Sequence, residues 1–521
     1  MNRVPPDDSL AVTGGTLLQP AARPLPSADD LAREAVACEA LLDRLAAHTD
    51  ILRHSPELAS QMRRQLREGK RPRLLELRIN GDEVGWLFDV LDVWVLQYSP
   101  HWLEQPGAYA LAPGLPLREA AHVDGASVRP VQWYFDNLLP EEELRKALAQ
   151  DARLAFEDAF GLLRHYGAES AGSLVLQPLG APVATTGLQP LPFDALARRI
   201  QQLPVAPLTQ AAPKRMSLAG AQNKMVVVYR PHPPAGAEVD TLFEPLAGTA
   251  STHILKPNST SHSYPHSVIN EYFVMKLAAA LKLNVPSVHR LYLPEPVYLI
   301  ERFDRRTAAS QDVQRIHAID TCQLLNSPRT LKYERANLPT LLSAVDATRS
   351  RALARNQLYQ WLVFNVLVGN GDNHLKNLSF TVSARGIELA PGYDMLCTAV
   401  YDTPLYAAER AIWPRTALGT VLPQGTHFDE VNHERLLAAG AALGLGESTA
   451  RRLLQDMLSR IEKEADALMQ AIGEDNQALE QRFKGMEHGA PHAAVAGGEM
   501  QLLRAIRHVV IRDMVAQVRK G

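Results

Sequence analysis

Three polar residues in the second half of the chain have the types and the spacing that metal-assisted phosphoryl transfer needs. Asp372 is followed five residues later by the amide Asn377, and a second acid, Asp394, comes after a further strand-length segment. One carboxylate can orient an attacking hydroxyl group, while the amide oxygen and the second carboxylate can hold Mg²⁺ against phosphates. Asp, Asn and Gly are also common wherever a chain turns. These residues alone therefore leave a polar loop and a phosphotransfer site equally open.

Two predicted elements flank this loop. Residues 355–369 have the periodicity of a buried amphipathic helix that ends at Gly369, and residues 378–382 have the composition of a short strand. The acid and its amide, together with His374 and Lys376, therefore lie on a tight loop between a rigid helix and a strand.

A segment of small residues that ends in a lysine lies upstream. Residues 217–224, SLAGAQNK, precede a predicted strand. Small residues let backbone N–H groups approach an anion closely, and Lys224 could reach a phosphate. The spacing is not that of a Walker loop, and many hairpins contain Ala-Gly. The segment is weak evidence by itself.

A lysine, a glutamate and a strand end follow this segment. Lys256 ends a predicted strand and Glu271 lies near the start of the next predicted helix. The two can form the ion pair that positions ATP phosphates. The strand of residues 297–303 leads to a candidate hinge at residues 301–305, and backbone amides of such a hinge could hydrogen-bond an adenine edge. Each feature alone has an ordinary structural explanation, but their order along the chain is typical of a bilobal protein kinase.

The composition is that of a globular protein and gives no reason to expect a membrane. Of the 521 residues 46% are hydrophobic, and the net charge of −3 offers no global electrostatic case for nucleic acid or lipid. No apolar run approaches membrane-spanning length, and the N-terminus lacks the pattern of a signal peptide. Cys38, Cys322 and Cys397 form no metal-binding pattern, which is typical of a reducing cytoplasm. We therefore expect a cytoplasmic protein.

Periodicity and proline content divide the chain into four parts. Residues 1–27 lack periodicity and are predicted to be disordered, whereas residues 28–69 predict a helical hairpin. Strand patterns begin at residue 73, around the turn Asn80-Gly81-Asp82, and a proline-punctuated stretch at 180–213 marks a boundary. Helical patterns, interrupted by a Gly/Ala/His linker at 488–498, dominate the C-terminal part. The predicted parts are residues 1–72, 73–200, 201–300 and 301–521.

Ten short motifs occur together along most of the chain. The N-terminal ones are GWLF at 85–88, FDNLLPEEELR at 135–145 and GAESAGSLVLQP at 167–178. The later ones are SLAGAQNK at 217–224, HILK at 253–256, NEYFVMKLA at 270–278, ERFDR at 301–305, DTCQLL at 320–325, GDNHLKN at 371–377 and GYDML at 392–396. With these motifs the sequence resembles the HipA family of bacterial serine/threonine kinases, toxins of type II toxin–antitoxin modules. The resemblance runs from about residue 73 to the late 400s.

The resemblance implies an α+β, bilobal protein-kinase-like fold with a small β-rich N-terminal domain and a mainly helical C-lobe. It implies binding of ATP and Mg²⁺, with Asp372 as the catalytic acid/base, and Asn377 and Asp394 as the metal ligands. Glu271 would be the ion-pair partner of the phosphate-contacting lysine. Ser217 matches the autophosphorylated serine, where added charge would expel the adjoining loop and switch the kinase off. The implied nucleotide-binding residues are Ala219, Gly220, Ala221, Gln222, Asn223, Lys224, Lys256, Glu301, Arg302, Phe303, His374, Leu375, Lys376, Asn377, Tyr393 and Asp394.

The resemblance also implies partners. Family members modify aminoacyl-tRNA synthetases and thereby halt translation, so a protein of this kind is the expected substrate. A HipB-like DNA-binding antitoxin is the expected partner, and DNA would be reached only through it. Asn223 stands where the family carries an acid, and residues 1–72 and part of 180–213 lie outside the family pattern. These departures concern regulation and partner choice more than chemistry.

Two alternative functions stay open. A small-molecule phosphotransferase of the aminoglycoside type would share the acid–amide–acid arrangement, but the Ser217 loop and the N-terminal domain argue against it. A catalytically weak corepressor acting with an antitoxin is the non-enzymatic alternative. Retention of Lys256, Asp372, Asn377 and Asp394 argues against that reading, because decay of an enzyme usually removes one of them.

Overall fold

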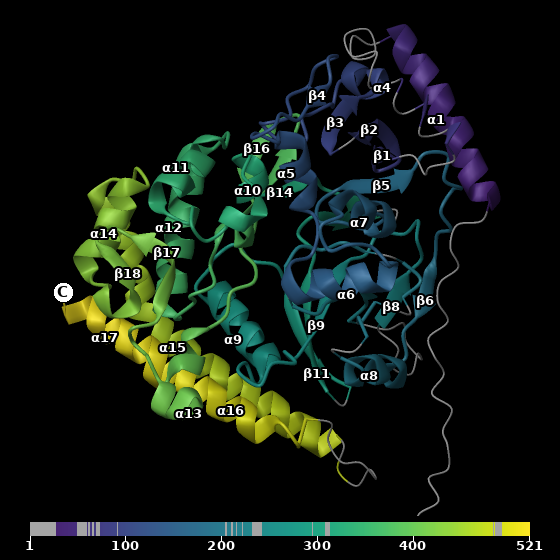
Figure 1. The fold of residues 1–521 in the computed structure, drawn as a ribbon. Coiled ribbons are helices and arrows are strands. Elements are labelled where there is room, and N and C mark those ends of the chain that lie inside the picture. The colour runs from purple at the N-terminus through teal and green to yellow at the C-terminus, as the bar shows by residue number, and fades with distance from the viewer. Residues whose placement is uncertain are drawn as a thin grey trace, which may run out of the picture.

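The computed structural model describes residues 28–48, 60, 63–64, 67–68, 73–90, 92–203, 206–209, 212–214, 216–220, 222–231, 242–293, 295–307, 313–482, 484 and 492–520. Several sequence predictions lie outside the described residues. These are the tail at 1–27, most of the second helix of the predicted 28–69 hairpin, part of the linker at 488–498, and Ala221. The described chain has an α+β fold, with two main sheets on one side and a large helical part on the other (Figure 1).

Five antiparallel strands near the N-terminus form a sheet with the order β4-β3-β2-β1-β5. The strands are β1 (Leu74–Ile79), β2 (Asp82–Val90), β3 (Val93–Tyr98), β4 (His122–Val123) and β5 (Leu174–Pro178). Asn80 and Gly81, in the turn between β1 and β2, both have positive φ angles of 50° and 97°. A two-residue hairpin turn of this kind needs residues that tolerate positive φ, so the predicted hairpin is confirmed.

Helices cover both faces of this sheet. On one face α1 (Ala28–His48), the first helix of the predicted hairpin, places Cys38 and Leu41 in one core with Trp86 and Phe88 of β2. On the other face Leu87 belongs to the main core of the molecule. The helices that contribute to that core from the N-terminal part are α4 (Pro100–Glu104), α5 (Pro130–Asp136), α6 (Glu142–Ala152) and α7 (Ala159–Tyr166).

A second, six-stranded antiparallel sheet has the order β10-β11-β9-β7-β8-β6. Its strands are β6 (Leu188–Pro190), β7 (Met225–Tyr229), β8 (Leu242–Pro245), β9 (His253–Pro257), β10 (Val288–Tyr292) and β11 (Pro296–Glu301). Two helices, α8 (Phe193–Gln201) and α9 (Ser267–Ala280), belong to the same region. The proline-punctuated stretch thus supplies both an edge strand and a helix here. The sheet positions the small-residue loop before β7, Lys256 on β9 and the hinge after β11.

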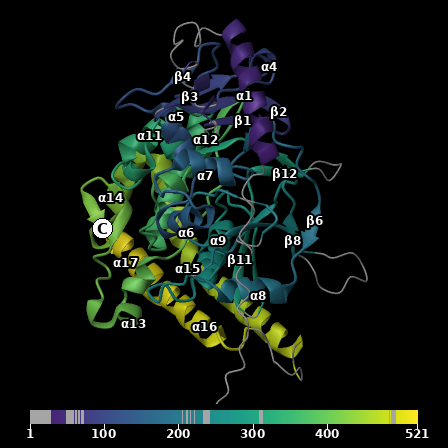
Figure 2. The same ribbon diagram turned by 45° about the vertical axis from the view of Figure 1, so that its right-hand side comes forward.

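The rest of the described chain is mainly helical. Its helices are α10 (Thr321–Leu324), α11 (Leu338–Asp346), α12 (Arg351–Leu367), α13 (Pro404–Ala407), α14 (His433–Ala442), α15 (Glu447–Arg482), α16 (Ala496–Ala505) and α17 (Arg512–Lys520). A π-helical segment (Ile506–Ile511) joins α16 to α17. Figures 1 and 2 show α16 and α17 running along α15 as one long helical layer that passes α9.

Short strands and turns complete the helical part. The strand pairs are β12 (Arg305–Thr307) with β13 (Val313–Arg315), β14 (Ala318–Asp320) with β15 (Ser379–Ser383) and β16 (Gly386–Leu389), and β17 (Ala417–Leu422) with β18 (Gly425–His427). The helix predicted to end at Gly369 is α12, and the strand predicted after the loop is β15, so both are confirmed. One continuous hydrophobic core runs from the N-terminal sheet through α9 to α12, α15 and α17. The N-terminal part is therefore packed into the same core as the helical part.

Candidate active site

The loop between α12 and β15 is built by local turn chemistry. Gly369 has a φ of 69°, and a Cβ there would lie 2.5 Å from a methyl group of Val510, so only glycine fits. The Asn370 side chain donates to the Asn365 side chain at 2.7 Å and accepts the Asp372 N–H at 3.0 Å. These bonds tie the start of the loop to the buried end of α12.

Asp372 lies at the edge of this loop with one side-chain partner. The Tyr333 hydroxyl donates to Asp372 Oδ1 at 2.6 Å. Burial raises the pKa of Asp372 to about 6, although the Tyr333 hydrogen bond lowers it in part. At neutral pH the side chain is mostly a carboxylate, with a basicity suited to accepting a proton. No local pattern singles out Tyr333, which lies 39 residues from Asp372 along the chain.

Asn377 and Asp394 have the orientation and the charge that a cation site needs. The Asn377 side-chain NH₂ donates to the Asp372 carbonyl at 2.8 Å, which leaves its amide oxygen available. Asp394 has a φ of 57° and binds Lys256 Nζ through Oδ1 at 2.5 Å. Burial alone would raise the pKa of Asp394, but the Lys256 and Lys224 ammonium groups lower it to about 2. This amide oxygen and permanent carboxylate fit Mg²⁺, which prefers oxygen ligands.

Other parts of a metal site would come from outside the protein chain. Among the described residues there is no cluster of three or more His, Cys, Asp or Glu side chains arranged to hold a metal ion. One amide and one carboxylate are few ligands for an octahedral ion. Mg²⁺ bound here would therefore depend on phosphate oxygens and water, as it does in phosphotransfer sites generally.

Lys256 and Glu271 form the ion pair predicted from their positions. Lys256 Nζ lies 2.8 Å from Glu271 Oε1, and both side chains are buried. Burial opposes both charges, but Asp394 and Glu271 hold the pKa of Lys256 well above its usual value. Burial raises the pKa of Glu271 to about 7 despite the neighbouring ammonium. The lysine is thus a fixed positive charge between Glu271 of α9 and the Asp394 carboxylate.

The small-residue loop of residues 217–224 also carries a lysine, Lys224, whose side chain bonds to the backbone of its own loop. Lys224 Nζ donates to the Ala219 carbonyl at 2.7 Å, and burial, followed by repulsion from Lys256, lowers the pKa of Lys224 to about 8. Gly220 has a φ of 104°. Gln222 donates weakly to the Pro257 carbonyl at 3.4 Å, next to β9. The loop therefore brings two lysines together at the place where phosphate charge would bind.

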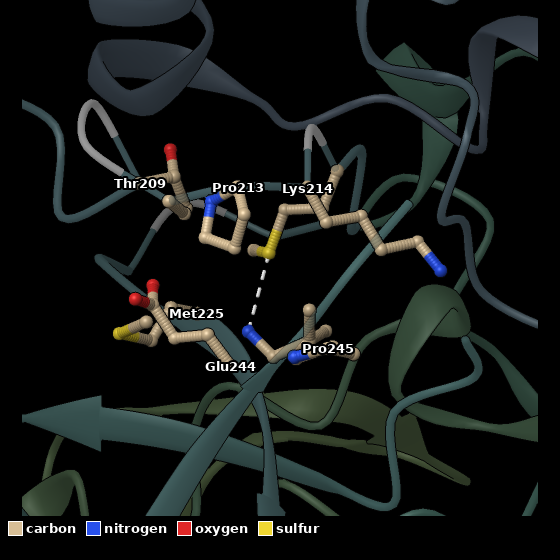
Figure 3. Close-up of a pocket in the computed structure, with 9 residues that line it drawn as sticks. Thr209, Pro213, Lys214, Met225, Glu244 and Pro245 are labelled. Carbon is tan, nitrogen blue, oxygen red and sulfur yellow. Dashed lines mark hydrogen bonds between the residues drawn. The ribbon is translucent and has the colours of Figure 1, made fainter. Parts of the chain in front are cut away.

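Ser217, at the start of the loop, is fully buried. Its N–H donates to the Glu169 carbonyl at 2.7 Å, while its hydroxyl has no hydrogen-bond partner. Figure 3 shows a small hollow lined by Pro213 and Lys214, which precede the loop, and by Met225 and Glu244 of β7 and β8. At this hollow Met216 accepts a hydrogen bond from the Val226 N–H at 3.3 Å. The hollow has no room for a buried water molecule. It is a packing feature between the segment that precedes the loop and strands β7 and β8.

The hinge residues divide between a stacked ring and a buried ion network. The Phe303 ring stacks on Tyr393 with centroids 5.6 Å apart and planes 23° apart. The Arg302 guanidinium is buried and binds Asp304 at 2.7 Å and Glu169 at 3.0 Å. Its side chain is therefore occupied by structural contacts. A nucleotide would meet the backbone of residues 301–303 here, which stays a prediction.

The remaining loop residues face the protein interior. Lys376 Nζ donates to Asp320 at 2.7 Å and to the carbonyl and side-chain oxygens of Asn137 at 2.8 and 2.9 Å. Burial lowers the pKa of His374 to about 4, so the ring is neutral, and it packs edge-on against Tyr333. Leu375 is buried. The nucleotide contacts predicted for these three residues, and for Asn223, stay predictions.

Comparison with known proteins is decisive at this point. The HipA-like C-terminal domain family matches residues 216–465, and the HipA N-terminal domain family matches residues 75–177. The serine/threonine-protein kinase toxin HipA of Shewanella oneidensis is 32% identical over 349 residues, which are 63% of this chain and 76% of that protein. This chain belongs to the HipA family. The resemblance predicted from its motifs is confirmed.

Further relatives agree with the HipA assignment. The Y4mE protein of Sinorhizobium fredii is 36% identical over 318 residues, or 58% of this chain and 72% of that protein. A solved structure described as the Shewanella oneidensis MR-1 toxin–antitoxin system HipA, HipB and operator DNA complex superimposes with a TM-score of 0.64 at 25% identity. The alignment covers 86% of this chain and 99% of that one. The bilobal, kinase-like α+β fold of the HipA family is thus confirmed here. Among the described residues no helix has the length and apolarity to cross a membrane.

Proposed function

We propose that this HipA-family protein is an ATP- and Mg²⁺-dependent protein serine/threonine kinase. It would phosphorylate itself and a cellular protein, with an aminoacyl-tRNA synthetase as the expected target class, and so inhibit translation and growth. One observation carries the proposal. Asp372, Asn377, Asp394, Lys256 and Glu271 come from four separate segments and lie together in one site. Lys256 pairs with Glu271 and Asp394, and Asn377 donates to the Asp372 carbonyl. The Tyr393 hydroxyl, next to Asp394, donates to the Lys376 carbonyl, next to Asn377, at 2.8 Å and so connects the two groups. A chain that had lost catalysis would be under no requirement to keep all five together.

The residues have distinct tasks in this mechanism. Asp372, with its pKa of about 6, would accept the proton of the attacking serine or threonine hydroxyl. The tyrosine hydroxyl now bonded to Oδ1 would have to share or leave that oxygen. Asn377 and Asp394 would hold Mg²⁺, which neutralises phosphate charge when bound. Lys256 and Lys224 would position the phosphates.

Self-phosphorylation would require the loop to move. The Ser217 hydroxyl is buried, so it cannot reach a phosphate in the arrangement seen here. A phosphate on Ser217 would place about two negative charges where no polar partner exists. We therefore propose that modification keeps the 217–224 loop displaced and the kinase inactive. A HipB-like antitoxin is the proposed partner, because the Shewanella relative is described in complex with HipB and operator DNA.

Transfer of label from ATP tests the proposal. Wild-type protein incubated with γ-labelled ATP and Mg²⁺ should incorporate label, and Asp372→Asn should lose at least about 100-fold of the rate. Binding of ATP to Asp372→Asn, measured by calorimetry, should persist, since this change keeps the size of the side chain. Loss of label in Ser217→Ala as well would place the self-modified site at Ser217. ATP binding without transfer, in the presence of candidate protein substrates, would contradict the proposal and favour the corepressor.

A further inference from the structure

Residues 137–141, which connect α5 to α6 in the N-terminal part, contact two pieces of the candidate active site. The Glu141 N–H donates to the carbonyl of Gly220 in the phosphate loop at 3.3 Å. The Asn137 carbonyl and side-chain oxygens accept from Lys376 of the catalytic loop at 2.8 and 2.9 Å. This short segment therefore bridges the loop expected to bind phosphate and the loop that carries Asp372.

The Glu141 side chain adds a third contact. Its carboxylate is buried, accepts a hydrogen bond from Lys332 Nζ through Oε2, and faces Lys376 Nζ at 3.8 Å through Oε1. A buried carboxylate is tolerated only when cations compensate it. Burial alone would raise the pKa of Glu141, but Lys376 and Lys332 hold it below its usual value, so the group is ionised. One negative charge thus anchors two lysines from different segments.

Lys332, whose ammonium is held by Glu141, contacts two residues close to Asp372. The Lys332 carbonyl accepts the N–H of Leu375 in the catalytic loop at 3.2 Å. The next residue, Tyr333, receives the Lys332 ammonium over its ring at 5.0 Å and donates its hydroxyl to Asp372 at 2.6 Å. Tyr333 is half exposed, so few neighbours restrain its ring. These neighbours are His374, which packs against it edge-on, and the anchored Lys332 ammonium.

A second ion pair supports the same segment. Asp136, at the end of α5, accepts from Arg329 at 2.9 Å, just before the Lys332–Tyr333 pair. Asp136 and Glu141 therefore hold both ends of the 329–333 segment from the N-terminal part. Among the described contacts of the Lys332 ammonium, the carboxylate that binds it is Glu141, and no carboxylate of the helical part does so.

We infer that Glu141 is a positioning residue for phosphotransfer, which holds the 332–333 segment so that Tyr333 meets Asp372. The N-terminal part is then a component of the active site and not only a platform for partners. This inference rests on the proposed kinase function. Its chemistry is electrostatic: the Glu141 backbone contacts the phosphate loop, whereas its carboxylate orients the segment next to the catalytic acid.

Substitution of the carboxylate alone separates these two roles. Glu141→Gln keeps the backbone contact to Gly220 and the side-chain size but removes the charge. We expect kcat to fall about tenfold or more, with KM for ATP changed less than about threefold, since misplacing a catalytic group lowers kcat. Glu143→Gln is the matched control, because Glu143 lies two residues further on, in α6, is exposed, and pairs with Lys146 alone among the described residues. Its kcat should equal that of wild type.

A double-mutant cycle tests the route through Tyr333. If Glu141 acts by placing Tyr333, Glu141→Gln combined with Tyr333→Phe should be no slower than the slower single variant. Lys332→Gln removes the same ion pair from the other side and decides the question if Glu141→Gln fails to fold. It should also lower kcat at nearly constant KM.

The outcomes distinguish the two hypotheses. Wild-type protein without any phosphotransfer would overturn the proposed function and this inference with it. Active wild-type protein, with kcat of Glu141→Gln and Lys332→Gln within twofold of the Glu143→Gln value, would overturn the inference alone. Multiplicative losses in the double variant would also overturn it, because they would show that Glu141 and Tyr333 act independently.

Discussion

Gly220 is a single residue whose conformation controls the shape of the 217–224 loop. Its φ of 104° disfavours any side chain, and a Cβ there would lie 2.6 Å from Lys224 Nζ. Gly220→Ala must therefore displace the lysine from the Ala219 carbonyl. We expect KM for ATP to rise about tenfold and the free energy of unfolding to fall by about 1–2 kcal/mol. ATP titration and urea unfolding measure the two effects.

The matched control for Gly220→Ala is Gly473→Ala. Gly473 lies in α15, and a Cβ there meets no atom within 4 Å. This substitution should stabilise the helix by about 0.5–1 kcal/mol and leave KM for ATP unchanged. An unchanged KM in Gly220→Ala would mean that the folded-back Lys224 is not the nucleotide-binding arrangement.

Ser217 is a residue whose burial makes it sensitive to charge. Its hydroxyl has no partner, so Ser217→Ala should change the free energy of unfolding by less than about 1 kcal/mol. Ser217→Asp would bury an uncompensated carboxylate, which is costly enough to expel the loop. We expect Ser217→Asp to weaken ATP binding at least about tenfold and to expose the 217–224 loop to limited proteolysis. Equal ATP affinity and equal protease resistance in the two variants would contradict this.

At the scale of elements, Glu169 joins three segments behind the hinge. Its carboxylate is fully buried and pairs with Lys214, Arg302, Arg305 and Arg315 at 2.6–3.0 Å. Its carbonyl accepts the N–H of Ser217. The loop between α7 and β5 therefore fastens the phosphate loop to the hinge from the N-terminal side. Among the described residues this is the most densely compensated buried charge.

Removing that carboxylate should be strongly destabilising. Glu169→Ala leaves four neighbouring cations with Asp304 as the remaining buried anion, and breaking a buried pair from one side costs about 3–5 kcal/mol. We expect a loss of this size in urea unfolding. Glu157→Ala, an exposed glutamate before α7, should change stability by less than about 0.5 kcal/mol. A loss below about 1 kcal/mol in Glu169→Ala would show that the cations relax into solvent.

At the scale of the whole molecule, His317 links the N-terminal part to β14. Its Nε2 donates to the Leu111 carbonyl at 2.9 Å, and its Nδ1 lies 2.9 Å from the Ser173 hydroxyl. Burial lowers the pKa of His317 from 6.5 to about 4, outweighing the effect of the Leu111 hydrogen bond. The folded protein thus needs the neutral ring at a junction between its parts.

This neutral histidine predicts acid sensitivity. Below pH 6.5 the unfolded chain takes up a proton that the folded protein accepts only near pH 4. The contribution of His317 to the free energy of unfolding is therefore full above pH 6.5 and falls by up to about 3 kcal/mol as the pH drops to 4. His317→Asn should flatten the pH dependence of urea unfolding across this window, whereas the exposed His262→Asn should not. An identical slope in His317→Asn and wild type would contradict the assignment.

Features encoded in neighbouring residues were predictable from the sequence. Short-range conformational preferences predicted the Asn80-Gly81 turn and the helix that ends at Gly369. The order of the motifs along the chain predicted the pairing of Lys256 with Glu271. The motif order was also sufficient to identify the HipA family and its fold. These features could be predicted from local backbone preferences and residue spacing, because neither depends on the tertiary contacts of the chain.

The partners of individual charged side chains were decided only by the tertiary structure. The Lys376 ammonium binds Asn137 and Asp320, and the Arg302 guanidinium pairs with Glu169 in the interior, which no local pattern indicated. No local pattern singled out Tyr333, although its hydroxyl donates to Asp372. A long side chain can reach several neighbours, and burial makes its choice depend on which opposite charges the folded chain brings within about 3 Å. The sequence by itself therefore determined which reactive and charged side chains are present. Packing of the N-terminal part against the rest of the molecule decided which partner each charged side chain binds.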